Sequence, residues 1–542
     1  MIIISRSFWK VFHIPSVRLQ NKYRQYFGNE AKTIEDREIA LKMLMSVSGN
    51  IQKKMTERIK SESTYGMLLK LYYIFGEVHS FYLQEKEQRF DLVKENISLN
   101  NDQLEKNRNI QRSIIDACNI WIENCVLLQH DLQLSDIDIN KEFVMDIDLL
   151  IDMYLYGLTS QAISLLVLSK NINMKHSFYG IQIYLKDDLP IEVLKYHPVI
   201  YYNTTLVGNQ HDLVNKPLTS DANNTEFGKG FVSENKIEFL LWLAILCAFE
   251  KDQLRNDDKS LTIISKSRFI QLAESYTTPS VNGEFCYENF VLTKEKLKVH
   301  LRKNDEVIWI IGANKYRHEL RPFIGLEDGN VLINYGALEQ SKQLWTSYYS
   351  NGGMCYTNPS KKDDLCKAME KRNEELSDII LVTKLQEILR SHYSGTVDLK
   401  NVDYQRIFGE KEKNYGDYDI VFYVESKKEL FLIESKYFSD SLNSSGMVND
   451  YNKLFGENGY YKHCRERYDL VLAEPEKMKQ FINATADISV HMLFISSKPI
   501  EVEFQDDDGI VTFLALCNFE KYLMGNLLSE DGQNVVRPTH LL

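Results

Sequence analysis

The chain lacks several patterns that would assign it to a familiar class. Its eight cysteines among 542 residues are scattered, with no Cys-x-x-Cys pair. The sequence therefore predicts neither a zinc site nor a disulfide framework, and we expect a cytoplasmic protein in a reducing compartment. No apolar run is long enough to cross a membrane, and the longest, around 239–249, predicts a buried core helix.

An excess of positive charge is also missing. With 64 Lys and Arg against 76 Asp and Glu, the formal net charge is −12, which argues against a protein that coats nucleic acid by bulk attraction. Contact with a polyanion must then use a local patch, with a metal ion neutralising phosphate. Residues 1–29 are the exception, because they contain basic residues and no acid. A presequence and a basic arm on nucleic acid stay open there, but an ordinary surface segment is favoured.

What is present predicts an α+β multidomain protein, because the chain exceeds what one hydrophobic core organises. Residues 1–175 are expected to form an α-helical domain and residues 176–365 a mixed α/β domain. Residues 366–542 are expected to form an α/β domain with a central mixed sheet. The helical expectation rests on apolar stripes at helical spacing, of which one comprises Ile110, Ile114, Cys118, Trp121, Cys125 and Leu128.

Four further segments have clear local patterns. In the middle region we expect a polar loop over 203–230, rich in Asn and Gly, a buried strand over 307–311, and a hairpin over 323–334 that turns at Asp328 and Gly329. A long polar helix over 361–392 is expected to begin the last domain.

The stretch 416–436 contains the main functional pattern. Residues 416–424 form a run of β-branched and aromatic residues with Asp419 at its mouth, and the four apolar residues 430–433 lead into Glu434, Ser435 and Lys436. We expect two adjacent strands joined by the polar residues between them. Because side chains alternate along a strand, Glu434 and Lys436 should share a face while Ser435 turns away.

Two acids and a lysine at the ends of neighbouring strands fit a site for a hard cation. Mg²⁺ binds one or two carboxylates and fills its other positions with water and substrate phosphate. Asp419 and Glu434 can supply those carboxylates. An ammonium group such as Lys436 can hold the attacking water and offset charge that develops on a phosphate. The alternative is a surface hairpin whose charges only mark a strand end.

The pattern of Asp419, fourteen residues, then Glu434-Ser435-Lys436 resembles the PD-(D/E)XK nuclease superfamily. The resemblance covers about the last third of the chain, and Tyr418 stands where the literal motif has proline. It implies a restriction-endonuclease-like domain in which Asp419 and Glu434 hold Mg²⁺ or Mn²⁺ and Lys436 assists the nucleophilic water. The expected order of helix, three strands, helix and strand in residues 366–542 agrees with the core of that family.

Three further acids are candidates for the site. In the family a helix before the catalytic sheet often contributes an acid, which implies a role for Glu387, with Glu375 as its competitor; for either, an exposed helix charge is the alternative. Asp417 has the strand parity of Asp419 and is either a second ligand or a turn acid beside a glycine.

Two basic segments are candidates for contacts with nucleic acid. The first is 294–303 with the neighbouring Lys315, Arg317 and Arg321. The second lies on a helix expected over 450–472, where Tyr461, Lys462, Arg465 and Arg467 can face phosphates. A solvated helix face explains the first segment equally well.

Together these patterns predict a divalent-metal-dependent endonuclease-like hydrolase that cleaves phosphodiester bonds, with DNA as the expected substrate. Long non-catalytic regions fused to such nucleases suggest, by analogy of fold alone, an effector of bacterial restriction or antiviral defence. The helical amino-terminal region is a candidate surface for a protein partner or a second copy. The alternative function is a catalytically inactive protein of the nuclease fold that binds or scaffolds.

Overall fold

The computed structural model describes most of the chain. The residues that it does not describe are 1, 6–13, 31, 62–63, 95–100, 129–145, 169–171, 178–179, 186–217, 255–258, 277–281, 300, 302–304, 309–314, 352–362, 439–451, 498–504, 507, 530–533 and 539–540.

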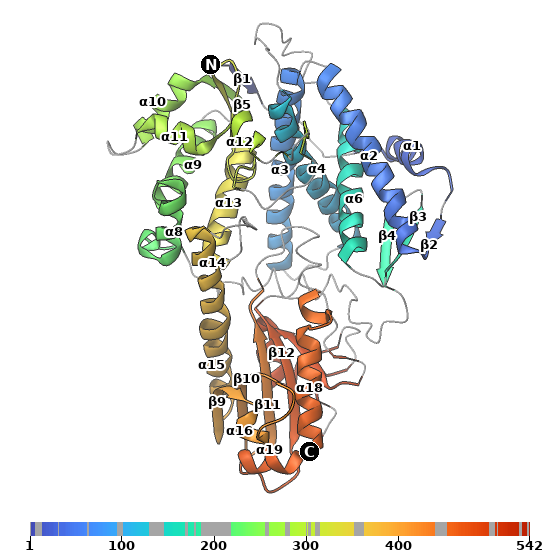
Figure 1. Ribbon diagram of the computed structural model, residues 1–542, viewed down its shortest axis with the longest axis vertical. Coiled ribbons are helices and arrows are strands. Elements are labelled where there is room, and N and C mark those ends of the chain that lie inside the picture. The colour runs from blue at the N-terminus through green and yellow to red at the C-terminus, as the bar shows by residue number, and fades with distance from the viewer. Residues whose placement is uncertain are drawn as a thin grey trace.

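Long helices make up most of the amino-terminal part (Figure 1). They are α1 Ser16–Phe27, α2 Arg37–Ser61, α3 Thr64–Lys94, α4 Asn101–Leu127 and α6 Ile147–Leu168. The apolar stripe predicted between Ile110 and Leu128 lies on and just after α4, and all six of its side chains are buried. A small antiparallel sheet in the order β2-β3-β4 flanks these helices and consists of β2 Lys32–Ile34, β3 Ile172–Ser177 and β4 Gly180–Leu185.

A five-stranded sheet separates this helical layer from a second layer of helices. Its order is β1-β5-β8-β7-β6, formed by β1 Ile2–Ser5, β5 Lys259–Ser265, β8 Asn330–Asn334, β7 Phe323–Gly325 and β6 Val291–Leu292. Neighbouring residues of β8 face opposite cores, because Leu332 packs with the amino-terminal helices whereas Val331 and Ile333 pack with the second layer. The second layer comprises α8 Glu226–Asn235, α9 Phe239–Leu254, α10 Lys266–Tyr276, α11 Gly283–Phe290 and α13 Tyr335–Asn351. The short helix α12 Lys294–Lys298 packs instead against α4 and buries Leu297 in the core of the amino-terminal helices.

This shared sheet joins the first two expected domains. Strand β1 comes from the start of the chain yet pairs with β5, and β3 and β4 extend past residue 175 while pairing with β2. The division at 175 is therefore crossed in both directions, whereas the division into three domains stays a prediction.

Two local expectations in the middle region are contradicted in the residues that the structure describes. Of the loop expected over 203–230, residues 203–217 lie outside the described part of the chain. Residues 226–230 belong to helix α8, which begins at Glu226 behind the side-chain cap of Thr225 on the Gly228 amide. Val307 and Ile308 belong to no strand, and residues 309–311 lie outside the described part of the chain. The hairpin over 323–334 is confirmed: β7 and β8 are antiparallel, and Gly329 has the positive φ of 79° that the turn requires.

The carboxy-terminal part is a mixed five-stranded sheet between helices. Its order is β13-β12-β11-β10-β9, with β11, β12 and β13 parallel and β10 antiparallel to both neighbours. The strands are β9 Val397–Asp403, β10 Asp417–Val424, β11 Glu429–Lys436, β12 Ser489–Ser496 and β13 Val511–Ala515. The expected order of helix, three strands, helix and strand is confirmed.

Helices cover both faces of this sheet (Figure 1). On one face α15 Val382–His392 and α20 Leu516–Leu523 pack on Ile420, Phe422 and Ile433. On the other face α16 Gln405–Phe408, α18 Tyr460–Ala473 and α19 Pro475–Phe481 pack on Val421, Leu430 and Leu432. The helix expected from 450 thus begins its main run only at Tyr460.

A continuous helical run joins the two halves of the molecule, which are the upper half in Figure 1, formed by the amino-terminal and middle regions, and the lower half around the carboxy-terminal sheet. It comprises α14 Asp364–Glu374, the π-helical segment η4 Glu375–Leu381, and α15. Helix α14 packs against α8 in the upper half, and α15 packs on the carboxy-terminal sheet. The long helix expected over 361–392 is confirmed from Asp364 onward, but its π-helical segment was not expected.

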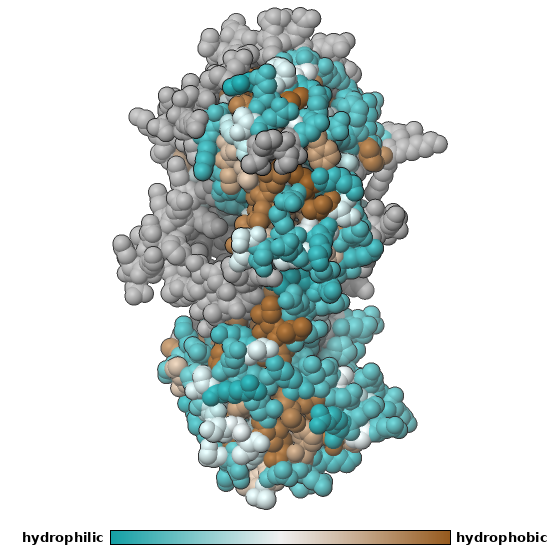
Figure 2. Space-filling view, turned by 90° about the vertical axis from the view of Figure 1, so that its left-hand side faces the viewer, coloured by the Kyte–Doolittle hydropathy of each residue, from teal (hydrophilic) through white to brown (hydrophobic). Residues whose placement is uncertain are grey.

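On the side of the molecule where α14 and α15 lie, hydrophilic surface separates several apolar patches. Figure 2 shows this side, with apolar patches in both the upper and the lower half. Among the described residues no helix combines the length and apolar character needed to span a bilayer.

The fold as a whole is a mixture of helix and sheet, as expected for the α+β class.

Candidate active site

The hairpin of β10 and β11 brings the three residues of the sequence motif together. Ile420 pairs with Ile433, so Asp419 and Glu434 follow as the next positions at the open end of the hairpin. The loop at the closed end contains four residues, since Val424 pairs with Glu429. The register is fixed because one face of each strand packs under α18 and the other under α15.

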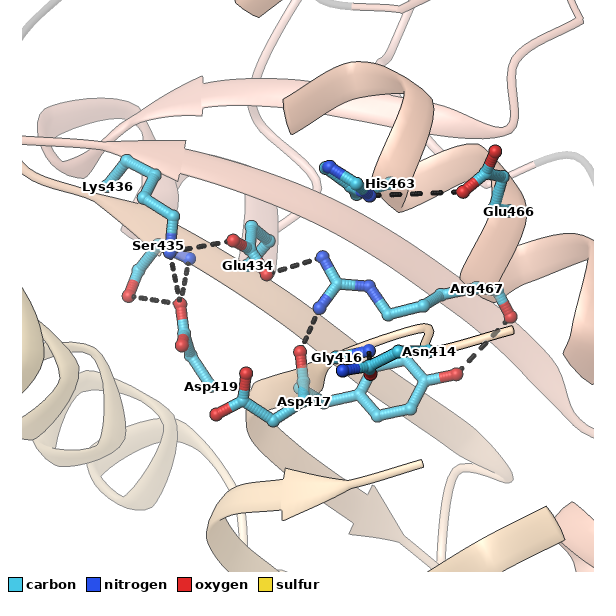
Figure 3. A network of polar contacts seen from close by, with 11 residues as sticks. Asn414, Gly416, Asp417, Asp419, Glu434, Ser435, Lys436, His463, Glu466 and Arg467 are labelled. Carbon is cyan, nitrogen blue, oxygen red and sulfur yellow. Dashed lines mark hydrogen bonds and ion pairs between the residues drawn. The ribbon is translucent and has the colours of Figure 1, made fainter. Parts of the chain in front are cut away.

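Lys436 lies between the two carboxylates (Figure 3). Its Nζ is 2.7 Å from Oε1 of Glu434 and 3.7 Å from Oδ2 of Asp419. Glu434 and Lys436 therefore share a side of β11, as expected. Ser435 does not turn away from the site, because its amide and its hydroxyl both donate to Asp419 Oδ2, at 2.6 and 3.0 Å.

Arg467 of α18 holds the other oxygen of Glu434. Its Nη2 lies 2.5 Å from Glu434 Oε2, and its Nη1 donates to the backbone carbonyl of Asp417 (Figure 3). The guanidinium also lies over the ring of Tyr418, 5.5 Å from the centroid. The Arg467 side chain is only 4% exposed. One buried cation thus ties α18 to both strands of the hairpin.

The turn before β10 places Asp417 at the edge of this group. Gly416 adopts a positive φ of 77°, which a residue with a side chain disfavours. The Asp417 side chain is exposed, and its backbone carbonyl, not its carboxylate, is what Arg467 contacts. The structure thus favours the turn-acid interpretation of Asp417 over a second ligand.

Burial and neighbouring charges shift the pKa values of the three motif residues in different directions. Burial, with a further contribution from Glu434, raises the pKa of Asp419 to about 6 against the opposing effect of Lys436. Burial also favours neutral Glu434, but Arg467 and Lys436 outweigh it and lower that pKa. Burial acts against the charge of Lys436, yet Glu434 and Asp419 outweigh it and raise the pKa. Lys436 is therefore a cation at neutral pH.

The structure does not bring Glu387 to this group. Its side chain is 58% exposed and forms an ion pair with Lys384 at 3.5 Å. It lies on α15, on the sheet face opposite to the one that α18 covers. Its competitor Glu375 is 48% exposed and pairs with Arg372. Both therefore fit the alternative of exposed helix charges.

Several cations of the first basic segment that the structure describes are engaged within the protein. Arg321 is 3% exposed and donates to the Asn235 side chain at 3.0 Å, and Arg317 pairs with Glu319. Lys296 donates to the Val291 carbonyl, and burial lowers its pKa to about 8. These cations stabilise the fold of the middle region. His300, Arg302 and Lys303 lie outside the described residues.

The second basic segment is also engaged within the protein. Arg465 pairs with Asp506 and Asp508, both at 3.0 Å, and Tyr461 donates to Asp506. Lys462 donates to a backbone carbonyl at 3.1 Å. Arg467 is the member of this segment that reaches the motif residues. The sequence predicts the helix on which Arg467 lies, but it does not predict the ion pair of Arg467 with Glu434.

The donor set suits a cation that keeps water ligands and does not suit a cage of carboxylates. Within the described residues no three His, Cys, Asp or Glu side chains gather closely enough to hold a metal ion. Asp419 and Glu434 nevertheless provide two carboxylates at the open end of the β10–β11 hairpin, which is enough for Mg²⁺ or Mn²⁺ with water and phosphate. Asp419 Oδ1 accepts no hydrogen bond from the described residues, and its side chain is 15% exposed. That oxygen is the one best placed to accept a cation.

The arrangement as a whole is two carboxylates and two cations in contact at the open end of a buried hairpin. Comparisons of the chain with protein-family models, with curated proteins and with solved structures found no match.

Proposed function

We propose that the protein is a divalent-metal-dependent nuclease that hydrolyses phosphodiester bonds, with DNA as the expected substrate. The observation that carries the proposal is the contact of Lys436 with both Glu434 and Asp419 at the ends of adjacent strands. The mixed sheet with helices on both faces agrees with the fold that the PD-(D/E)XK resemblance implies.

The acidic and basic residues of the site have different roles in the proposed reaction. Asp419 and Glu434 would hold Mg²⁺ or Mn²⁺, which supplies a Lewis acid for the phosphate and lowers the pKa of bound water. Because the pKa of Lys436 is raised, its ammonium donates hydrogen bonds to the attacking water or to a phosphate oxygen and does not remove a proton. Ser435 fixes the Asp419 carboxylate through two hydrogen bonds, which leaves Oδ1 free for the cation.

Cleavage assays with the purified full-length protein test this function. We expect it to cut plasmid or single-stranded DNA in Mg²⁺ or Mn²⁺ and to stop in EDTA. Asp419→Ala and Lys436→Ala should each lower the rate by about 100-fold or more. Glu387→Ala is the matched control and should cleave as the wild type does. Equal cleavage by all four proteins would remove the motif residues from the mechanism.

A second function is favoured by a different observation. Both oxygens of Glu434 already contact cations, and no third carboxylate joins the two of the motif among the described residues. A protein that keeps this fold only to bind or scaffold has no need of a metal. Calorimetric titration separates the two functions: the nuclease takes up Mn²⁺ in a manner that depends on Glu434, whereas the scaffold does not.

A further inference from the structure

The four charged groups of the site balance one another before any ligand binds. Asp419 and Glu434 contribute two negative charges, and Lys436 and Arg467 contribute two positive charges. The three ion pairs among them are 2.5, 2.7 and 3.7 Å long. The nearby acid Glu466 does not disturb this balance, because it pairs with Lys413 at 2.5 Å.

Arg467 is the less mobile of the two cations. It is buried, it bridges Glu434 and the Asp417 carbonyl, and its own backbone carbonyl accepts a hydrogen bond from Tyr418 at 3.3 Å. The Lys436 side chain is 24% exposed, and Lys436 is the last residue of β11. A cation that approaches Glu434 Oε1 can therefore displace the Lys436 ammonium, but it meets the positive charge of Arg467 in place.

Before a ligand binds, the site is neutral. Binding of a divalent cation therefore gives the site an excess of two positive charges. The anionic phosphodiester of a substrate offsets part of that excess, so each ligand improves the binding of the other. By thermodynamic linkage the two effects are equal in size. Without Arg467 the site would carry a net negative charge and would attract the cation alone.

We propose that Arg467 makes the binding of the metal and of the phosphodiester mutually dependent, so that the site takes up its cation efficiently only together with nucleic acid. This inference rests on the proposed nuclease function and adds to it a control of metal loading. Arg467 then acts through Glu434 and the local charge, as a positioning residue.

The opposite effect is also physically reasonable, which makes the sign decisive. Partners that orient a metal ligand commonly improve metal affinity, and their removal weakens it by about 10 to 100-fold. If orientation of Glu434 is the main contribution of Arg467, its loss must weaken cation binding. If charge balance is the main contribution, its loss must strengthen cation binding.

The experiment is a calorimetric titration of Mn²⁺ into full-length protein, with and without a saturating phosphorothioate DNA duplex that resists hydrolysis. For the wild type we expect Mn²⁺ binding at least about tenfold tighter with the duplex. Arg467→Met, which keeps much of the volume over Tyr418 without the charge, should bind Mn²⁺ alone about tenfold tighter than the wild type and gain less from the duplex. Arg467→Lys keeps the charge and should behave like the wild type.

Two further variants keep the test decisive. Arg465→Gln removes a cation of the same helix that pairs elsewhere, and it should leave Mn²⁺ binding unchanged. Lys436→Met removes the other cation of the balance from a partly exposed position. If Arg467→Met does not fold, Lys436→Met carries the same expectation of tighter binding of Mn²⁺ alone.

Each outcome has one meaning. Weaker or unchanged Mn²⁺ binding in folded Arg467→Met, beside a wild type that binds Mn²⁺ and cleaves DNA, overturns this inference and leaves the nuclease function standing. A wild type that neither binds Mn²⁺ nor cleaves overturns both. Tighter binding in both charge-removing variants, with a smaller effect of the duplex, supports the inference.

Discussion

At the scale of single residues, Asp419 combines a functional position with a cost to stability. Its pKa is raised from 3.8 to about 6, chiefly by burial, so the folded state binds a proton more readily than the unfolded state does. Ionised Asp419 thus opposes folding above about pH 6, and this penalty disappears as the pH falls toward 4.

Asp419→Asn should therefore increase stability while it abolishes cleavage. An amide oxygen can accept the two hydrogen bonds from Ser435 without carrying a buried charge. At pH 7 we expect the free energy of unfolding to rise by about 1–2 kcal/mol, with the difference vanishing near pH 4. Denaturant unfolding at both pH values measures it, with Asp417→Asn as the exposed control. A less stable variant at pH 7 would contradict the assigned shift.

The same shift predicts how metal affinity depends on pH. Only the ionised form of Asp419 can hold a cation, so protons compete with the metal below about pH 6. We expect the Kd for Mn²⁺ to be constant above pH 7 and to increase about tenfold per pH unit below 6. Calorimetry across this range tests the expectation, and a Kd that does not change down to pH 4.5 would exclude Asp419 as a ligand.

The motif residues could be predicted from sequence because they are local, whereas their partner could not. Asp419 and Glu434 belong to one hairpin, so composition and alternation suffice to bring them together. Arg467 reaches Glu434 from a helix 33 positions away, and its direction depends on how α18 packs. The position of Glu387 away from the motif residues could not be predicted either, because the sequence does not show which face of the sheet α15 covers.

At the scale of elements, the π-helical segment η4 keeps one apolar stripe continuous. Leu365, Met369, Leu376, Leu381 and Leu385 are all buried along the run from α14 to α15. Most steps between buried positions fit an α-helix, but the step from Leu376 to Leu381 is one residue longer. The wider turn absorbs that residue, and Ile379 stands 62% exposed within it.

Deletion of Ile379 should therefore be tolerated, whereas insertion at the same place should not. The deletion restores a spacing of four between the buried leucines and should change the free energy of unfolding by less than about 1 kcal/mol. One alanine inserted after Ile379 turns the leucines of α15 away from the sheet and should cost more than about 3 kcal/mol. Thermal and denaturant unfolding compare the two. Equal losses in the free energy of unfolding would show that the wider turn does not determine which side of the helical run is buried.

The elements best predicted were those whose pattern is complete in a short window. The hairpins around Gly329 and between β10 and β11 have turn residues and alternation side by side. Helix α8 was missed because its glycines, Gly228 and Gly230, suggest a loop. In the structure a Cβ at Gly228 would lie 2.3 Å from the Ala222 carbonyl oxygen, so glycine serves close packing there.

At the scale of the whole molecule, the apolar cores fall into two groups. Residues from 376 onward form two cores that enclose the carboxy-terminal sheet, whereas Leu365, Cys366 and Met369 of α14 belong to the core of the middle region. Pairing of β1 with β5 joins the start of the chain to the middle region. No local pattern predicts that pairing, because an exposed strand edge accepts many partners.

This division predicts where the chain can be cut. A fragment of residues 375–542 contains both cores of its sheet and should fold as a monomer. A fragment of residues 363–542 also exposes the apolar face of α14 and should self-associate. Circular dichroism and light scattering compare the two fragments. An unfolded shorter fragment would show that the upper half is needed to fold the sheet.

The run from α14 to α15 has a mechanical consequence. It is fixed at one end to α8 and at the other to the sheet that carries Asp419 and Glu434, and its wider turn contacts β11 between the two attachments. We expect a tilt of the part of the molecule around α8 to act on η4, because both ends of the helical run are packed against other elements. Since η4 contacts β11, such a tilt would reach the strand that contains Lys436.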